Sequence, residues 1–373
     1  MERDFVGEIE EPASSYSSVV VDKERFIQLL TELDKEQEIA PLRERVSAVR
    51  RIIASPDESS RELLPEATNG NAVSLRRDVL VSELDQIAGA HTIERAKYYL
   101  KRLERGVERV KTSKINDINL LRWKEYEGVL TDSLWVLDRR DTSGAHLGWY
   151  WGNFVPQIPR QLMMRYTKKG DWVLDTFAGS GTTLIECRRM GRNGIGIELN
   201  ARVAARAREM VERESNLHSV RTEIIRGDAR NVDARSALEG YGAKQVQLVV
   251  MHPPYHDIIR FSKDRKDLSG AKSTDAFLKM FGEAVENASR LLEKGRYLAL
   301  IIGDKYSGGD WIPLGFYSMS QVLERGFSLK SIVVKNFDET RAKRDQKQLW
   351  RYRALVGGFY IFKHEYIFIF RKK

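Results

Sequence analysis

A short segment in the second half of the chain combines an acidic strand end with a glycine loop. The apolar run Trp172–Leu174 leads into Asp175, the loop Ala178-Gly179-Ser180-Gly181 follows, and a helical pattern opens at Thr182. Glycines let the backbone approach a ligand closely, and the free N–H groups of a helix start favour an electron-rich one. A second apolar run ends in Glu198, 23 residues after Asp175, where an acid suits the hydroxyl pair of a ribose.

A second motif follows a later apolar run. Leu248–Met251 leads directly into His252-Pro253-Pro254-Tyr255. The two prolines hold an extended turn in which a backbone carbonyl is free and fixed. The combination is specific: a strand that leads into a glycine loop, an acidic residue suited to a ribose, and a later X-Pro-Pro-Tyr motif. It resembles the S-adenosylmethionine-dependent methyltransferases that modify exocyclic amino groups of DNA bases, the adenine-N6 and cytosine-N4 family.

The resemblance covers about two thirds of the chain and implies roles on the cofactor side. Glu198 would bind the ribose hydroxyls of S-adenosylmethionine and Asp228 its adenine amino group, while the glycine loop packs against the methionine part. Residues 152–159 resemble the segment that closes over the methionine end. The cofactor residues expected on this basis are Asn153, Asp175, Phe177, Ala178, Gly179, Ser180, Gly181, Thr182, Glu198 and Asp228.

Other nucleotide sites fit the glycine loop less well. Position 184 is Leu, so the third glycine of a dinucleotide fingerprint is missing, and the Gly-Lys-Ser/Thr end of a P-loop is also missing. No metal site is expected.

Methylation of an aromatic amine explains why the second motif has these residue types. The lone pair of such an amine is delocalised into the ring, so it must be drawn out of conjugation. Acceptors that bind the two amine hydrogens achieve this. The side chain of His252 and the carbonyl of Pro253 are the expected acceptors, Pro254 fixes the turn, and Tyr255 offers a face for stacking the base. The base must be flipped out of a duplex, or the substrate must be single-stranded.

His252 departs from the family pattern, which usually has Asp, Asn or Ser at this position. A neutral imidazole offers one lone pair as an acceptor, whereas an imidazolium offers none. A neutral His252 therefore suits the role, and a purely structural His252 with backbone acceptors is the alternative. The departure leaves the target base open. Adenine N6 is slightly favoured over cytosine N4, only because adenine enzymes are the commoner class.

Two basic segments are candidates for contact with DNA. One follows the catalytic motif and contains Arg260 and Lys263. The other, residues 335–353, is expected to be a loop between the last two strands and has seven basic residues against three acidic ones. Basic side chains interleaved with aromatics suit phosphate contact and base stacking, and a solvated hairpin is the alternative. The candidates in the second segment are Arg341, Lys343, Arg344, Lys347, Trp350 and Arg351.

Composition agrees with a polyanionic partner without requiring one. The chain has 62 Lys and Arg against 53 Asp and Glu, a net charge of +9. The single Cys187 excludes a disulfide framework and a cysteine-based zinc site. The N-terminus has no signal-peptide pattern, and no apolar run approaches the ~20 residues of a membrane span. We therefore expect a cytoplasmic protein.

The elements that must position these motifs alternate between strand and helix after residue 130. This pattern predicts an α/β fold, and the resemblance implies a seven-stranded Rossmann-like sheet with one reversed strand near its edge. Residues 1–130 are expected to form a mainly helical accessory domain for DNA binding, dimerisation or both, with a loose arm over 1–20 and a loop over 55–75. Residues 131–373 are expected to form the catalytic domain.

The predicted function is site-specific DNA methylation, with a homodimer and a cognate restriction endonuclease as candidate partners. Two rivals remain. One is an RNA base methyltransferase, which the same pocket would suit. The other is a non-catalytic DNA-binding subunit that has lost its chemistry at His252.

Overall fold

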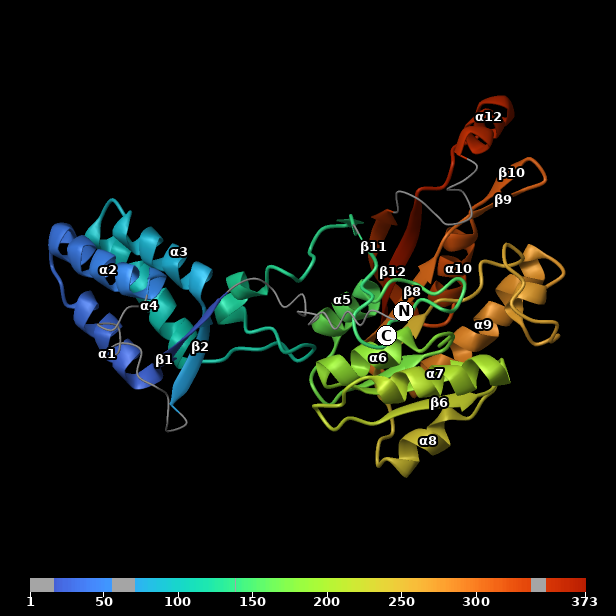
Figure 1. The fold of residues 1–373 in the computed structure, drawn as a ribbon, viewed down its shortest axis with the longest axis horizontal. Helices are drawn as coiled ribbons and strands as arrows, with labels where there is room; N and C mark the ends of the chain where they lie inside the picture. The colour runs from blue at the N-terminus through green and yellow to red at the C-terminus, as the bar shows by residue number, and fades with distance from the viewer. Residues whose placement is uncertain (1–16, 56–70, 138, 337–346) are drawn as a thin grey trace, which may run out of the picture. The chain divides into compact units, whose positions relative to one another are not determined.

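The computed structural model describes residues 17–55, 71–137, 139–336 and 347–373. The chain divides into two compact units, drawn in Figure 1. The first holds Met1–Lys114 with Ile118–Gly128, and the second holds Ile115–Asp117 with Val129–Lys373. Within the described residues, no helix is both long and apolar enough to cross a membrane.

The first unit is mainly helical. Its helices are α1 (Lys23–Asp34), α2 (Ile39–Ala54), α3 (Arg77–Ala88) and α4 (Ile93–Glu108), followed by a 3-10 helix over Leu120–Tyr126. Apolar residues at helical spacing, such as Phe26, Leu30 and Leu33, are buried in its core. Asp22 and Thr92 cap the starts of α1 and α4 by accepting from backbone N–H groups three residues on.

A small two-stranded sheet in this unit corrects the expectations for residues 1–20 and 55–75. Strand β1 (Ser18–Asp22) pairs antiparallel with β2 (Ala72–Arg76), so each segment ends in a strand. Val19 and Val21 are buried while Val20 is 45% exposed, the alternation of a half-buried strand. Five residues are too short a run to stand out in the sequence, and the partner strand lies about fifty residues away. Apart from Ser17, Ser55 and Asn71, the remaining residues of both predicted segments lie outside the described ones.

The second unit is built on one eight-stranded sheet, in the order β3-β11-β12-β8-β7-β4-β5-β6. The strands are β3 (Leu134–Trp135), β4 (Trp172–Asp175), β5 (Asn193–Glu198), β6 (Thr222–Arg226), β7 (Val246–Met251), β8 (Leu292–Ile302), β11 (Phe327–Asn336) and β12 (His364–Lys372). β12 runs antiparallel to both of its neighbours, and every other pairing is parallel. The α/β class with one reversed strand is confirmed, and the two-residue strand β3 adds an eighth member at the edge.

Helices cover both faces of the sheet, as Figure 1 shows for this unit. They are α5 (Gln157–Tyr166), α6 (Thr182–Met190), α7 (Ala201–Arg213), α8 (Ala234–Gly240), α9 (Thr274–Leu291), α10 (Leu314–Leu323) and α12 (Lys347–Gly357). Val249 and Met251 of β7 share a core with α9, whereas Leu248 and Val250 share a core with α5. Both faces of β7 are therefore buried, which explains its unbroken apolar sequence.

Two details after β8 differ from the sequence-based expectation. A hairpin of β9 (Lys305–Ser307) and β10 (Asp310–Ile312) follows β8 directly. Residues 347–357, expected as part of a loop, form α12. The segment that suggested a nucleic-acid loop also contains good helix formers such as Leu349 and Arg351.

The sheet topology decides which residues meet at its carboxyl edge. Asp175, Glu198 and Met251 end parallel strands at this edge. Because β12 is reversed, its first residues lie there as well, and Glu365 is in register with Lys335 near the end of β11. This edge is where ligands bind in open α/β sheets.

Candidate active site

A cavity of about 800 Å³ opens at the carboxyl edge of the sheet. Its volume lies within the range of small-molecule and cofactor sites. Both sequence motifs line it. The wall residues that the sequence predicted are Asn153, Phe177, Ala178, Gly179, Thr182, Glu198, Asp228, His252, Pro253, Pro254 and Tyr255.

Asp175 lies beneath the glycine loop and is not part of the cavity wall. Its carboxylate accepts from the Phe177 N–H at 3.0 Å and from the Thr183 hydroxyl at 2.5 Å. Burial raises the pKa of this carboxyl to about 6. Asp175 therefore ties the end of β4 to the start of α6, which fixes the loop between them.

Two glycines are required where the loop meets its surroundings. Gly181 precedes α6 with φ of +82°, a left-handed conformation that favours glycine. At Gly179, φ is +50° and a Cβ would lie 3.1 Å from the Tyr150 ring. Ser180 faces a neighbouring segment, since its hydroxyl accepts from Asn153 Nδ2 at 3.0 Å. Ser180 and Gly181 thus shape the loop from behind the wall.

Glu198 presents a buried carboxylate to the cavity. Its two oxygens accept from the N–H groups of Gly179 at 3.0 Å and Asn200 at 2.8 Å. Burial, with smaller contributions from Asp175 and Asp267, raises its pKa to about 7. Each carboxylate oxygen has a further lone pair, so a pair of ribose hydroxyls can still be accepted.

Asp228 also lines the cavity, beyond the end of β6. Arg230 binds its carboxylate, with Nη2 2.7 Å from Oδ2, and also lies 3.4 Å from Glu283. This bidentate contact orients Asp228 while leaving an edge of the carboxylate on the wall. An amino group is a donor that such an edge can accept.

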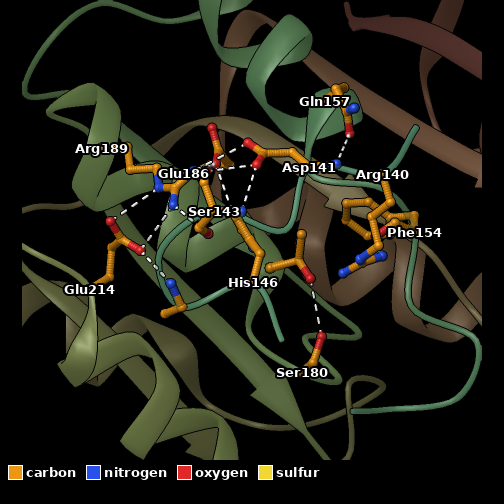
Figure 2. Close-up of polar contacts among 12 residues, drawn as sticks. Arg140, Asp141, Ser143, His146, Phe154, Gln157, Ser180, Glu186, Arg189 and Glu214 are labelled. Carbon is orange, nitrogen blue, oxygen red and sulfur yellow. Dashed lines mark hydrogen bonds and ion pairs between the residues drawn. The ribbon is translucent and has the colours of Figure 1, made fainter. Parts of the chain in front are cut away.

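The segment before α5 forms a further wall of the cavity. Its residues 143–146 are bound to Glu186 and Arg189 of α6 and to Glu214, as Figure 2 shows, and we call these contacts the clasp. His146 Nε2 lies 2.7 Å from Glu186 Oε1, and both side chains are buried. Arg189 Nη2 donates to the carbonyl of Ser143 at 2.7 Å, and the Ala145 N–H donates to Glu214 at 2.9 Å.

Arg140 joins the same segment to the cavity wall. Its Nη1 donates to the carbonyl of Phe154 at 2.9 Å and to Asn153 Oδ1 at 3.1 Å. Asn153 in turn donates to Ser180 of the glycine loop. Arg140 and Ser180 therefore hold Asn153 in place, the residue predicted to lie at the methionine end of the cofactor.

The His252-Pro253-Pro254-Tyr255 motif, predicted to be catalytic, is held by a chain of polar contacts. His252 Nε2 lies 3.2 Å from the Tyr255 hydroxyl, which donates to Glu365 Oε2 at 2.8 Å. Lys335 Nζ lies 3.2 Å from Glu365 Oε1. Phe154 makes an edge contact with the His252 ring, with ring centroids 4.9 Å apart.

Burial lowers the pKa of His252 to about 4, with Glu365 opposing and Lys335 adding to this shift. His252 is therefore a neutral imidazole near pH 7, the state that the acceptor role requires. Burial also raises the pKa of Tyr255 well above its usual range, so its hydroxyl keeps its hydrogen.

The residues after the motif anchor the loop. His256 is buried, and its Nε2 lies 3.0 Å from the carbonyl of Ala271. Lys305 Nζ lies 3.0 Å from His256 Nδ1 and 2.5 Å from Asp257 Oδ1. These contacts use both ring nitrogens of His256, so it holds the loop rather than a ligand.

The predicted nucleic-acid residues are only partly described. Arg260 and Lys263 are exposed on the loop after the catalytic motif. Arg351 is exposed on α12, which begins at Lys347, and Arg353 lies over the partly buried Trp350 ring at 5.2 Å. Arg341, Lys343 and Arg344 lie outside the described residues.

The cavity-wall residues that sequence reasoning missed include Glu365, Lys335, Tyr150 and Arg140. Lys335 lies near the end of β11, and only the reversal of β12 brings Glu365 to the same edge. The one signal for Glu365 in the sequence is that an acidic residue stands near the start of an otherwise strongly apolar strand, β12. Tyr150 lies in the aromatic stretch before α5 and packs against Phe261 with ring centroids 5.7 Å apart.

The chain is similar to known methyltransferases over limited segments. A family model described as DNA methylase matches residues 90–209, which include the glycine loop and Glu198 but precede His252. The Type II methyltransferase M.Cfr9I of Citrobacter freundii is 37% identical over 68 residues, 18% of this chain and 21% of that protein. M.XycI of Xanthomonas campestris is 32% identical over 84 residues, 22% of this chain and 27% of that protein.

A tRNA (guanine(10)-N2)-dimethyltransferase of Methanocaldococcus jannaschii is 32% identical over 128 residues, 32% of this chain and 36% of that protein. The chain thus matches about a fifth to a third of the length of these three relatives. Among solved structures, TrmN from Thermus thermophilus has a TM-score of 0.38 and 17% identity, covering 60% of this chain and 50% of TrmN.

The sheet order with one reversed strand and the cavity at the carboxyl edge of the sheet agree with the Rossmann-like fold that the sequence predicts. The wall fits S-adenosylmethionine because Glu198 offers acceptors for a diol, and Gly179, where a Cβ would meet the Tyr150 ring, leaves room beside the loop backbone. Over these matched segments, residues 90–209 for the family model, the chain is similar to DNA amino-methyltransferases, the adenine-N6 and cytosine-N4 enzymes.

Proposed function

We propose that this protein transfers a methyl group to the exocyclic amine of adenine or cytosine in DNA. The supporting observation is that the His252-Pro253-Pro254-Tyr255 motif and the Glu198 carboxylate line one cavity. A donor bound at Glu198 and an amine bound at His252 would therefore share a single enclosure. Orienting two reactants in this way removes much of the entropic part of a barrier.

The cofactor, when bound, supplies an electrophilic methyl group. Glu198 accepts the hydrogens of its ribose hydroxyls, and Asp228 accepts a hydrogen of its adenine amine. Gly179, without a side chain, lets the loop backbone lie close to the methionine part. Asn153, fixed by Arg140 and Ser180, closes this end of the cavity.

On the amine side, His252 and the carbonyl of Pro253 accept the two amine hydrogens. The nitrogen lone pair, freed from the ring, would then form the new bond to the methyl carbon. The bond from that carbon to the sulfonium sulfur would break, and its electron pair would stay on sulfur in a neutral thioether. One proton leaves the methylated nitrogen for solvent, so charge balances. Tyr255 and Phe154 contact His252 from two sides and hold its ring in place.

The contact with DNA is proposed to use the exposed basic residues near the cavity mouth. Arg260 and Lys263 follow the catalytic motif within a few residues, and Lys266 of the same loop lines the cavity. Arg351 of α12 is a further candidate, as are the basic residues Arg341, Lys343, Arg344 and Lys347 around it. The first unit, the proposed accessory domain, would add DNA contacts or a dimer interface. A homodimer and a cognate endonuclease remain predictions.

An RNA base is the second candidate acceptor, because one relative is named as a tRNA guanine-N2 dimethyltransferase. It too modifies an exocyclic amine, so the same pocket logic applies. The deciding experiment offers purified protein a labelled methyl donor with unmethylated DNA and, separately, with RNA. Nucleosides are then identified by mass spectrometry. N6-methyladenine or N4-methylcytosine in DNA supports the proposal, and a methylated RNA nucleoside alone would replace it with the second candidate.

A matched pair of variants tests the DNA surface. Arg260→Ala with Lys263→Ala should weaken DNA binding at all sequences and reduce the slope of log affinity against log salt by about two. Lys244→Ala with Lys294→Ala removes two exposed lysines at the starts of β7 and β8, at the opposite edge of the sheet, and should leave the slope unchanged. Equal slopes for the two double variants would contradict the proposed surface.

A further inference from the structure

The chain of contacts behind His252 extends beyond the catalytic motif. It joins Tyr255 to Glu365 of β12, and Glu365 to Lys335 of β11. Glu365 and Lys335 are 9% and 7% exposed, and they are in register on adjacent antiparallel strands. Neither residue belongs to a motif of the family, and both line the same cavity as His252.

We propose that Glu365 is a positioning residue for His252. Acting through the Tyr255 hydroxyl, it holds the imidazole in the tautomer with the hydrogen on Nε2. This leaves the lone pair of Nδ1 for an amine hydrogen of the target base. The inference rests on the proposed function for its catalytic consequence, but not for the tautomer itself.

Hydrogen-bond directions carry the argument. A tyrosine hydroxyl has one hydrogen, and the carboxylate of Glu365, paired with the Lys335 ammonium, can only accept. The Tyr255 hydrogen is therefore given to Glu365 at 2.8 Å. The contact of 3.2 Å between His252 Nε2 and the Tyr255 oxygen then requires the hydrogen to be on Nε2.

The other ring nitrogen remains for the ligand. A neutral imidazole with a hydrogen on Nε2 has its lone pair on Nδ1. Among the described residues, none makes a hydrogen bond with Nδ1 of His252, and the residue lines the cavity. In the opposite tautomer Nδ1 would carry a hydrogen and would repel the amine hydrogens instead of accepting one.

Lys335 is the last residue of this chain of contacts and pairs with Glu365. Its ammonium binds the carboxylate oxygen that Tyr255 does not use. The charged groups that face His252 are thus Glu365 from β12 and Lys335 from β11, with the Tyr255 hydroxyl from its own loop and the Phe154 ring opposite. Nearly complete burial of both charged residues keeps solvent from competing for these contacts.

Nitrogen NMR of protein with labelled histidine measures the tautomer directly, and His252→Asn assigns the His252 signals. In the wild type at pH 7 we expect a protonated Nε2 and an unprotonated Nδ1. Tyr255→Phe keeps the ring but removes the hydroxyl, so the signals should move towards a mixture of tautomers. Glu365→Gln should do the same in part, because an amide can either donate or accept. For both variants methyl transfer at saturating substrates should fall about tenfold, the effect of one hydrogen bond in the transition state.

Tyr366→Phe is the matched control. Tyr366 lies next to Glu365 on β12, and its hydroxyl contacts His364 and Asp304 rather than the catalytic motif. This variant should leave both the His252 signals and the rate unchanged. A wild-type His252 with its hydrogen on Nδ1, or a Tyr255→Phe protein with unaltered His252 signals, would overturn the inference. If the expected tautomer is found but the wild type methylates no nucleic acid, the proposed function fails while the positioning contact stands.

Discussion

The partly buried imidazole of His252 leads to a quantitative prediction about stability. Burial lowers its pKa from 6.5 to about 4 in the folded protein, whereas in the unfolded chain an imidazole titrates near ~6.5. Between these pH values the unfolded chain binds a proton that the folded protein does not. The contribution of His252 to stability is therefore fully present above pH ~6.5 and is lost as the pH falls towards ~4.

The size of the effect follows from the two pKa values. Proton linkage gives a loss of about 2.5 kcal/mol in the free energy of unfolding between pH 7 and pH 4.5 from this one residue. The Asn side chain of the His252→Asn variant does not titrate in this range. Between pH 7 and pH 4.5 the free energy of unfolding of this variant should therefore fall by about 2.5 kcal/mol less than that of the wild type. Asp175 and Glu198 also titrate here, but they are common to both proteins and cancel in the comparison.

Urea unfolding followed by circular dichroism at several pH values provides the measurement. His218→Asn is the matched control, since His218 is an exposed histidine of the same unit, and it should follow the wild-type curve. Parallel curves for wild type and His252→Asn between pH 7 and 4.5 would show that His252 is not desolvated. The neutral acceptor role argued from its burial would then lose its support.

Three further predictions concern the cofactor side and the clasp. The affinity for S-adenosylmethionine should rise as the pH increases through about 7, because ribose hydroxyls bind the ionised form of Glu198, and calorimetry with Glu198→Gln should show no such rise. Gly179→Ala should weaken the affinity for S-adenosylmethionine, because its Cβ would meet Tyr150. The control Gly170→Ala has similar backbone strain but no near neighbour, so it should cost only about 1–2 kcal/mol of stability and leave that affinity unchanged. His146→Ala should lower the free energy of unfolding by about 1–3 kcal/mol in urea titrations, because it removes the 2.7 Å partner of a buried Glu186 oxygen. An unchanged free energy of unfolding would show that the contact between His146 and Glu186 does not stabilise the fold.

The central part of the fold could be predicted because its signals are local. Unbroken apolar runs such as Leu248–Met251 mark strands that are buried on both faces, and glycines mark the one loop that must lie close to a ligand. The ends of β4, β5 and β7 were therefore correctly placed at one edge of the sheet. The short strands β1 and β2 were missed because five residues carry too little periodicity.

The remainder of the site depends on contacts between distant segments. Glu365 lies 110 residues after Tyr255, and no local pattern predicts that their side chains meet. Asp175 has the sequence position of a ligand residue, yet two local donors turn it beneath the loop. The lowered pKa of His252 likewise follows from packing by Phe154 and the sheet, which the motif alone does not reveal.

The reversed strand has a consequence for the order in which this protein can be completed during synthesis. β12 lies between β11 and β8 in the sheet but is translated after both of them. Until it emerges from the ribosome, the backbone groups of β8 and β11 that it will pair have no partner, an exposed edge of the kind that invites misassembly. The same strand delivers Glu365 to the cavity. A nascent chain can thus form the proposed cofactor side of the cavity early, while the proposed amine side is completed only when β12 pairs with β8 and β11.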